Sequence, residues 1–69
     1  MNKQALETLL TEKEVARITS LSIASVRRWR LRGEGPPFVR INSSIRYQPS
    51  DVASWIASRP RGGTREVKE

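Results

Sequence analysis

Residues 22–33 read SIASVRRWRLRG, a pattern that predicts one short helix with an apolar seam and four arginines. Ser22 is suited to cap the first turn, and Gly33 to take the left-handed conformation that closes a helix. Apolar side chains recur at the three- and four-residue spacing of one helical face. Arg28 and Arg32 fall on the opposite side, one turn apart, and Arg27 is expected near them. The segment therefore predicts a helix with one buried and one basic face.

The positive charge of the chain is concentrated around this helix. The net charge is +6, and residues 27–46 hold six arginines and one acid, whereas residues 1–26 sum to zero. Arginine is suited to forked contacts with phosphate or guanine, so the pattern favours a polyanionic partner. The alternative from charge alone is a solvated helix face.

Several classes of protein are excluded by composition. The 69 residues allow one small domain, and they include neither cysteine nor histidine, which excludes disulfides, thiol catalysis and the usual zinc sites. Apolar runs are far shorter than the ~20 residues of a membrane helix, and no signal peptide is evident. We expect no metal, no cofactor and no membrane contact, and a soluble intracellular protein.

A shorter helix is predicted just before the basic one. Thr11 and Glu14 form a capping-box pattern, and the helix should run to about Thr19. Two short helices joined by a tight turn, the second basic, are the layout of a helix-turn-helix. Ser20 occupies the turn position where many such proteins have glycine.

A change of period after two prolines predicts a β-hairpin. Residues 38–41 and 45–47 are rich in aromatic and β-branched side chains, and residues 42–44 have turn chemistry. Arg40 and Arg46 should share the solvent side. The apolar residues expected to face the core are Val39, Ile41, Ile45 and Tyr47.

A third helix should begin with Ser50 as its cap and end near Ser58. We expect an N-terminal arm at 1–9, one domain at 10–59 and a disordered tail at 60–69. In the arm, Leu6, Leu9 and Leu10 extend either a strand or a helical turn onto the core.

Trp29 and Trp55 fall on the apolar faces of their helices, which favours packing in the core over stacking on DNA bases. The full set of core candidates is Leu10, Val15, Ala16, Ile18, Leu21, Val26, Trp29, Leu31, Val39, Ile41, Ile45, Tyr47, Val52, Trp55 and Ile56.

Four motifs occur in order along residues 10–56: LTxxEVA, SVRRW, PFVRI and IRYxxSDVxxWI. Together they resemble the short excisionase or AlpA-like group of winged helix-turn-helix proteins, related to the DNA-binding half of the MerR regulators. The resemblance implies an α+β, mostly α fold with two short N-terminal helices, a two-stranded hairpin wing and a C-terminal helix.

The resemblance also implies how DNA would be bound. Residues 23–32 enter the major groove, and residues 38–47 act as a wing on the minor groove or backbone. Arg28 is the candidate reader of guanine, Arg27 and Arg32 are candidate phosphate contacts, and Arg30 is expected to cover Trp29 instead. The wing tip lacks the glycine and basic residues of many relatives, so its hold on the groove should be weaker. The expected DNA-binding residues are Ser22, Ala24, Ser25, Arg27, Arg28, Arg32, Arg40, Ser43, Ser44 and Arg46.

The function implied by the resemblance is sequence-specific binding of double-stranded DNA without enzymatic activity. The leading hypothesis is an excisionase, a recombination directionality factor of a phage or mobile element that bends DNA for an integrase. It would be a monomer in solution that binds cooperatively on DNA, in the bacterial cytoplasm or nucleoid. The alternatives are a small AlpA- or MerR-like transcriptional regulator and, from another class, a protein-interaction adaptor.

Overall fold

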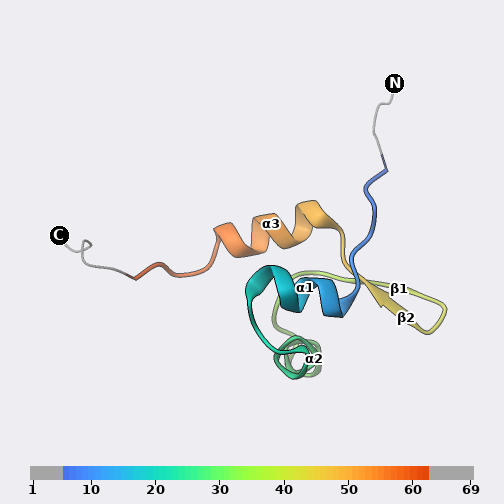
Figure 1. The fold of residues 1–69 in the computed structure, drawn as a ribbon, viewed down its shortest axis with the longest axis horizontal. Helices are drawn as coiled ribbons and strands as arrows, with labels where there is room; N and C mark the ends of the chain where they lie inside the picture. Colours follow the sequence, from blue (N-terminus) through green and yellow to red (C-terminus); the bar gives the residue numbers. More distant parts are fainter. Residues whose placement is uncertain (1–5, 63–69) are drawn as a thin grey trace.

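Over residues 6–62, the computed structural model contains three helices and one antiparallel hairpin (Figure 1). In chain order the elements are α1 (Glu12–Thr19), α2 (Ile23–Arg32), β1 (Val39–Ile41), β2 (Ser44–Arg46) and α3 (Pro49–Ala57). The hairpin lies between α2 and α3, which confirms the predicted winged helix-turn-helix. Residues 1–5 of the predicted arm and 63–69 of the predicted tail lie outside the described range.

Both ends of α1 are stopped by local hydrogen bonds. The Thr11 hydroxyl accepts from the Glu14 amide at 3.1 Å, and the Thr11 amide donates to the Glu14 carboxylate at 2.8 Å, which confirms the capping box. At the other end Ser20 has a φ of 59° and its amide bonds to the carbonyls of Ala16 and Arg17. Serine thus adopts the left-handed conformation usually taken by glycine, and the turn into α2 stays tight.

The ends of α2 also follow the predicted pattern, whereas the start of α3 does not. Ser22 caps α2 by accepting from the Ser25 amide at 3.1 Å, and Gly33 ends it with a φ of 68°. The predicted cap of α3, Ser50, is wrong, because Gln48 holds that position and Pro49 begins the helix. Proline suits the first helical position, where its missing amide leaves no donor unsatisfied.

The register of the hairpin corrects the predicted faces. Its turn holds two residues, 42 and 43, so Ile41 pairs with Ser44 and Arg40 pairs with Ile45. Residues directly opposite each other share a face, and shifting the pairing by one residue exchanges the faces. Val39 and Ile41 therefore lie on the face away from Ile45 and are exposed, contrary to the prediction. For the same reason Arg40 and Arg46 lie on opposite faces rather than together.

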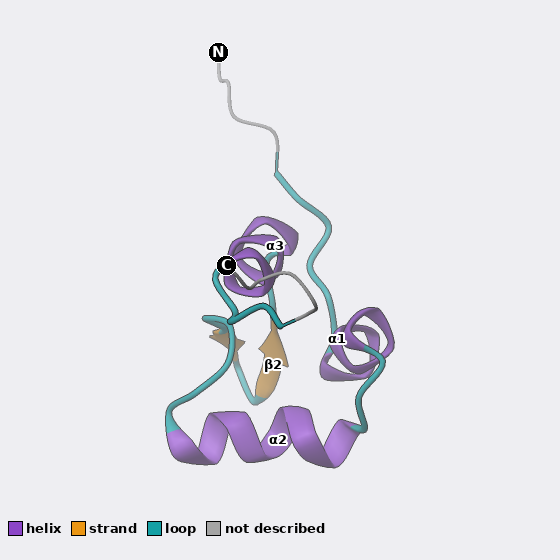
Figure 2. Cartoon of the chain, turned by 90° about the vertical axis from the view of Figure 1, so that its left-hand side faces the viewer, coloured by secondary structure: helices purple, strands orange, loops and turns teal. Residues whose placement is uncertain are grey.

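The helices form two layers. In Figure 1, α1 and α3 lie in the plane of the view and α2 is seen along its axis. In Figure 2, α2 lies in the plane and α1 and α3 are seen along their axes. α2 therefore crosses beneath the other two helices. The chain segment before α1 is extended, and Leu10 forms an antiparallel bridge with Tyr47. Extended chain is therefore right at Leu10, whereas the prediction that Leu6 reaches the core is wrong, because Leu6 is 97% exposed.

The core is small and draws on every helix and on the residue after β2. Tyr47 and Val26 are 1% and 0% exposed, and no polar residue is buried within residues 6–62. Leu10, Ile23, Trp29 and Ile45 pack against the core and are partly buried. The buried apolar residues are Val15, Ala16, Val26, Tyr47 and Val52.

Several predicted core residues lie at the surface instead. Leu31 is the clearest case, at 86% exposure on the outer side of α2. A domain of this size has too little interior to bury every apolar side chain of three short helices. The predicted core residues that are exposed are Ile18, Leu21, Leu31, Val39, Ile41 and Ile56.

Two tryptophans join α2 to α3. The rings of Trp29 and Trp55 have centroids 4.8 Å apart and are tilted by 52°, so they pack on each other rather than stand free. Gly35 lies against Trp29 with a φ of +84°, and a Cβ there would come within 2.8 Å of the Trp29 Cβ. Gly33 has a similar φ of +68° but nothing within 4 Å.

Alanine substitutions at the two glycines distinguish the cost of a left-handed backbone, present at both, from the cost of a steric clash, present only at Gly35. Gly33→Ala should lower the free energy of unfolding by about 1–2 kcal/mol, the cost of a left-handed alanine. Gly35→Ala should lower it by about 2–4 kcal/mol, because Trp29 must also move. Urea unfolding of both variants measures the difference. Equal losses would contradict the close packing of residue 35 on Trp29.

Candidate nucleic-acid interface

The basic side of α2 forms one free surface of the molecule. α2 crosses the base of the view in Figure 2, with the other elements on one side of it only. Arg28 and Arg32 are exposed on this helix and form no ion pair with any residue in 6–62. At the start of α2 Ser22 and Ala24 are exposed, and the Ser22 and Ser25 hydroxyls share a hydrogen bond of 3.1 Å. Two full positive charges are thus available to a ligand on this side.

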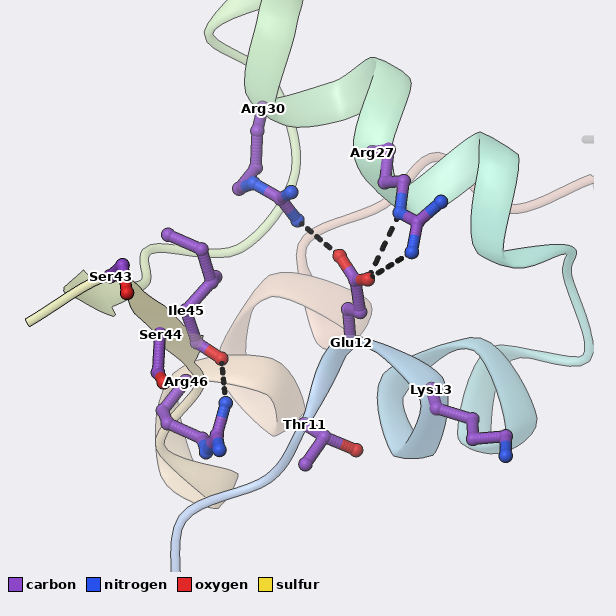
Figure 3. Close-up of a pocket in the computed structure, with 9 residues that line it drawn as sticks. All are labelled: Thr11, Glu12, Lys13, Arg27, Arg30, Ser43, Ser44, Ile45 and Arg46. Atoms are coloured by element: carbon purple, nitrogen blue, oxygen red, sulfur yellow. Dashed lines mark hydrogen bonds and ion pairs between the residues drawn. The ribbon is translucent and has the colours of Figure 1, made fainter. Parts of the chain in front are cut away.

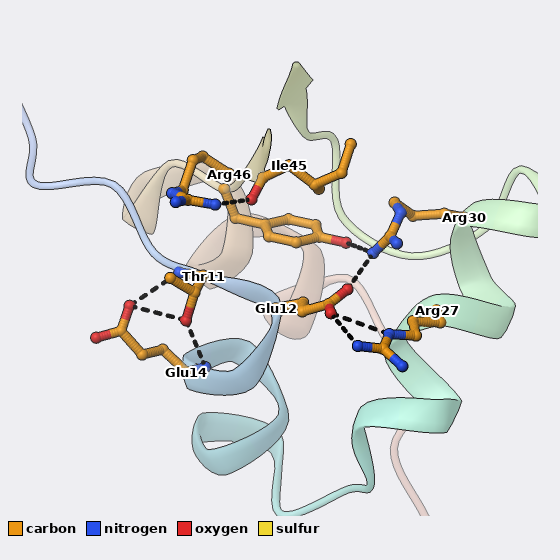
Figure 4. A network of polar contacts seen from close by, with 8 residues as sticks. Thr11, Glu12, Glu14, Arg27, Arg30, Ile45 and Arg46 are labelled. Atoms are coloured by element: carbon orange, nitrogen blue, oxygen red, sulfur yellow. Dashed lines mark hydrogen bonds and ion pairs between the residues drawn. The ribbon is translucent and has the colours of Figure 1, made fainter. Parts of the chain in front are cut away.

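The other two arginines of α2 are held by one carboxylate from α1 (Figure 4), so the expected grouping of Arg27 with Arg28 and Arg32 is wrong. Both Nε and Nη2 of Arg27 donate to Glu12 Oε2, at 2.9 and 2.7 Å. Nη1 of Arg30 donates to Glu12 Oε1 at 3.0 Å and to the Tyr47 hydroxyl at 3.4 Å. The expectation that Arg30 covers Trp29 is replaced by this arrangement, in which its guanidinium also lies 6.0 Å from the Phe38 ring.

This ion-pair network shifts the titration of its members. The hydrogen bond from Arg27 is the main cause that lowers the pKa of Glu12, and partial burial opposes it. The hydrogen bond to Glu12 raises the pKa of Arg27, and the hydrogen bond to Tyr47 is the main cause that raises the pKa of Arg30. All three groups therefore stay charged at neutral pH.

A cleft of about 570 Å³ lies between the start of α1, the side of α2 and the wing (Figure 3). Four cationic side chains line it: Lys13, Arg27, Arg30 and Arg46. Arg46 Nη1 donates to the Ile45 carbonyl at 2.7 Å, and neither Arg46 nor Lys13 forms an ion pair within the described residues. Glu12 is the one acid among the described residues that line the cleft.

The structure distributes the predicted site residues over three places. Ser22, Ala24 and Ser25 lie at the start of α2, and Arg28 and Arg32 lie on its outer side. Arg40 stands exposed on β1, on the hairpin face away from Arg46. The structure brings together, around the cleft, Arg27, Ser43, Ser44 and Arg46.

Two residues of this surface, Glu12 and Lys13, were not predicted from the sequence. Glu12 belongs to the part of the chain whose charges sum to zero, and only the packing of α1 on α2 brings it to the arginines. A usable signal was the three-residue spacing of Arg27 and Arg30, which puts both on one side of α2.

Two further kinds of feature are absent from residues 6–62. No helix within residues 6–62 is long and apolar enough to cross a bilayer. Nor do these residues hold a cluster of three or more histidine, cysteine or acidic side chains arranged for a metal ion.

The Glu12 network predicts a pH-dependent part of the stability. Folding lowers the pKa of Glu12, so the ionised carboxylate stabilises the folded state. This stabilisation is complete at pH values above the ordinary pKa of 4.5, and it is lost as the pH falls through the lowered pKa of the folded state. Glu12→Gln should lower the melting temperature by roughly 2–6 °C at pH 7 and by less at pH 3. Thermal unfolding followed by circular dichroism measures this. A difference that is the same at both pH values would contradict the ion-pair account.

Comparison with known proteins agrees with the fold. A family model described as a helix-turn-helix domain matches residues 9–60, which include all three helices and the hairpin. No curated protein and no solved structure gives a significant match. Helix-turn-helix domains are typical of DNA-binding proteins, which fits the exposed arginines of α2. The chain belongs to the helix-turn-helix domain family.

Proposed function

We propose that this protein binds double-stranded DNA in a sequence-specific manner, with α2 in the major groove. The observation that carries the proposal is the exposed basic side of α2 beside the wing, on a helix-turn-helix fold. A helix of 10 residues is about 15 Å long, and the major groove is wide enough, at about 12 Å, to admit a helix.

The residues of α2 fall into separate roles in this proposal. Arg28 points away from the core and reads a guanine through O6 and N7. Arg32, one turn further on, contacts a phosphate, and Ser22, Ala24 and Ser25 approach the DNA at the start of the helix, where recognition helices make base contacts. Arg27 is a phosphate contact whose charge is already shared with Glu12.

The wing supplies the second contact. Ser43, Ser44 and Arg46 face the cleft beside α2, so they approach the backbone or minor groove next to the site of α2. Arg40 lies on the other face of the hairpin and reaches DNA only where the duplex curves around the wing. The tip carries no charge at residues 42 and 43, so the wing contributes less to affinity than α2.

Within this function we propose the role of an excisionase that bends DNA for a separate integrase and performs no chemistry itself. The support is the set of four sequence motifs in their order and spacing, which a small AlpA- or MerR-like transcriptional regulator shares. The two roles differ in how DNA is occupied: an excisionase covers several adjacent sites, and a regulator covers one operator.

Selection of random duplexes by the purified protein at about physiological salt tests the proposal. We expect a short enriched motif that contains a guanine, in copies about one helical turn apart if the excisionase role is right and in one isolated site if the regulator role is right. Arg28→Ala should relax the preference at that guanine, and the control Arg59→Ala should leave the motif unchanged. No enriched motif would overturn sequence-specific binding and favour the protein-interaction adaptor.

A further inference from the structure

We infer that Glu12 is a positioning residue that increases the specificity of DNA binding. By pairing with Arg27, it weakens the contact of Arg27 with the phosphates of non-specific DNA. The inference rests on the proposed function and concerns the same surface. Its physical basis is competition: the carboxylate of Glu12 and a DNA phosphate are both anions that bind the forked donors of one arginine.

The geometry of the pair shows what a phosphate must displace. Glu12 Oε2 takes two of the five donors of Arg27, at 2.9 and 2.7 Å, and Glu12 Oε1 is occupied by Arg30. The Arg27 side chain is 59% exposed, so a phosphate has access to it, whereas the Arg30 side chain is 21% exposed and is also tied to Tyr47. Arg27 is therefore the arginine that exchanges between the two anions.

Besides competing with a phosphate for Arg27, the Glu12 carboxylate also repels the phosphate. The carboxylate lies in the cleft among the cationic side chains of α1, α2 and the wing, where a backbone phosphate has to approach (Figure 3). A negative charge there weakens the attraction for any phosphate, and it does so whatever the base sequence.

The two modes of binding depend on Arg27 to different extents. Sequence-independent binding is almost entirely electrostatic and gains from every cation that can follow the phosphates. Binding at a specific site uses base contacts from the outer side of α2, where Arg28 stands free of Glu12. Restraint of Arg27 therefore lowers the affinity for arbitrary DNA more than the affinity for the specific site.

The test compares Glu12→Gln with Glu34→Gln, which makes the same change in charge on an exposed residue outside the cleft. Binding to a mixed-sequence duplex of about 20 base pairs is followed by fluorescence anisotropy between about 50 and 200 mM salt. We expect Glu12→Gln to bind roughly three- to tenfold tighter at ~0.1 M salt, with a salt slope steeper by about 0.9 for one added phosphate contact. Glu34→Gln should change the affinity less than about twofold.

Two further comparisons, one with the selected duplex and one in the Arg27→Gln variant, test whether Glu12 acts on specificity and through Arg27. On the duplex obtained by selection, Glu12→Gln should gain less than on the mixed sequence, so that the ratio of the two affinities falls. In an Arg27→Gln background the added Glu12→Gln change should have a smaller effect than in the parent, because no arginine is released at residue 27 and only the repulsion by Glu12 is removed. Should Glu12→Gln not fold, single variants suffice: Arg27→Gln should then lose less affinity than Arg46→Gln, whose charge no acid shares within residues 6–62.

The outcomes separate this inference from the proposed function. A parent protein that binds DNA, together with an unchanged affinity and salt slope in Glu12→Gln, would overturn the inference alone. Equal gains on both duplexes would also overturn it, because Glu12 would then not affect specificity. A parent protein that binds neither duplex would overturn the proposed function and this inference with it.

Discussion

The arrangement of the whole domain depends on Tyr47. Its backbone bonds to Leu10 in both directions, at 2.7 and 2.8 Å; the residue is 1% exposed, and its ring centroid lies 6.1 Å from that of Phe38. Leu10 immediately precedes the cap of α1, and Tyr47 lies between β2 and α3, so one residue ties the start of α1 to the wing and to α3. The hydroxyl of Tyr47 also accepts from Arg30 of α2. Three short helices, none stable alone, are thereby held in one geometry.

The same packing divides the basic surface into two kinds of arginine. Arg27 and Arg30 face α1 and share the charge of Glu12, whereas Arg28 and Arg32 face outward without an acidic partner in the described residues. A count of positive charge along α2 therefore overstates what is available to a ligand. The outward pair is the part of the surface suited to contacts with bases and phosphates, and the inward pair holds α2 on α1.

Most helix ends could be predicted from neighbouring residues, although the cap of α3 was placed two residues late, at Ser50 instead of Gln48. The caps at Thr11, Ser22 and Gly33 were predictable because each depends on residues within one helical turn. The faces of the hairpin were wrong, because a turn of two residues rather than three exchanges the sides of β1. The contact of Glu12 with Arg27 joins residues 15 apart, and no local pattern contains it. Most of the fold was therefore predictable, and the electrostatics of the site were not.

The central claim is that the outward arginines of α2 and the wing bind DNA. Its most direct test is the affinity for the selected duplex at ~0.1 M salt of two double variants of equal charge. One is Arg28→Gln/Arg46→Gln, and the other is Arg59→Gln/Arg61→Gln, beyond the end of α3. We predict that the first binds at least about tenfold more weakly than the parent and that the second stays within about threefold. Equal losses in the two variants would contradict the claim and leave only general attraction between a basic protein and DNA.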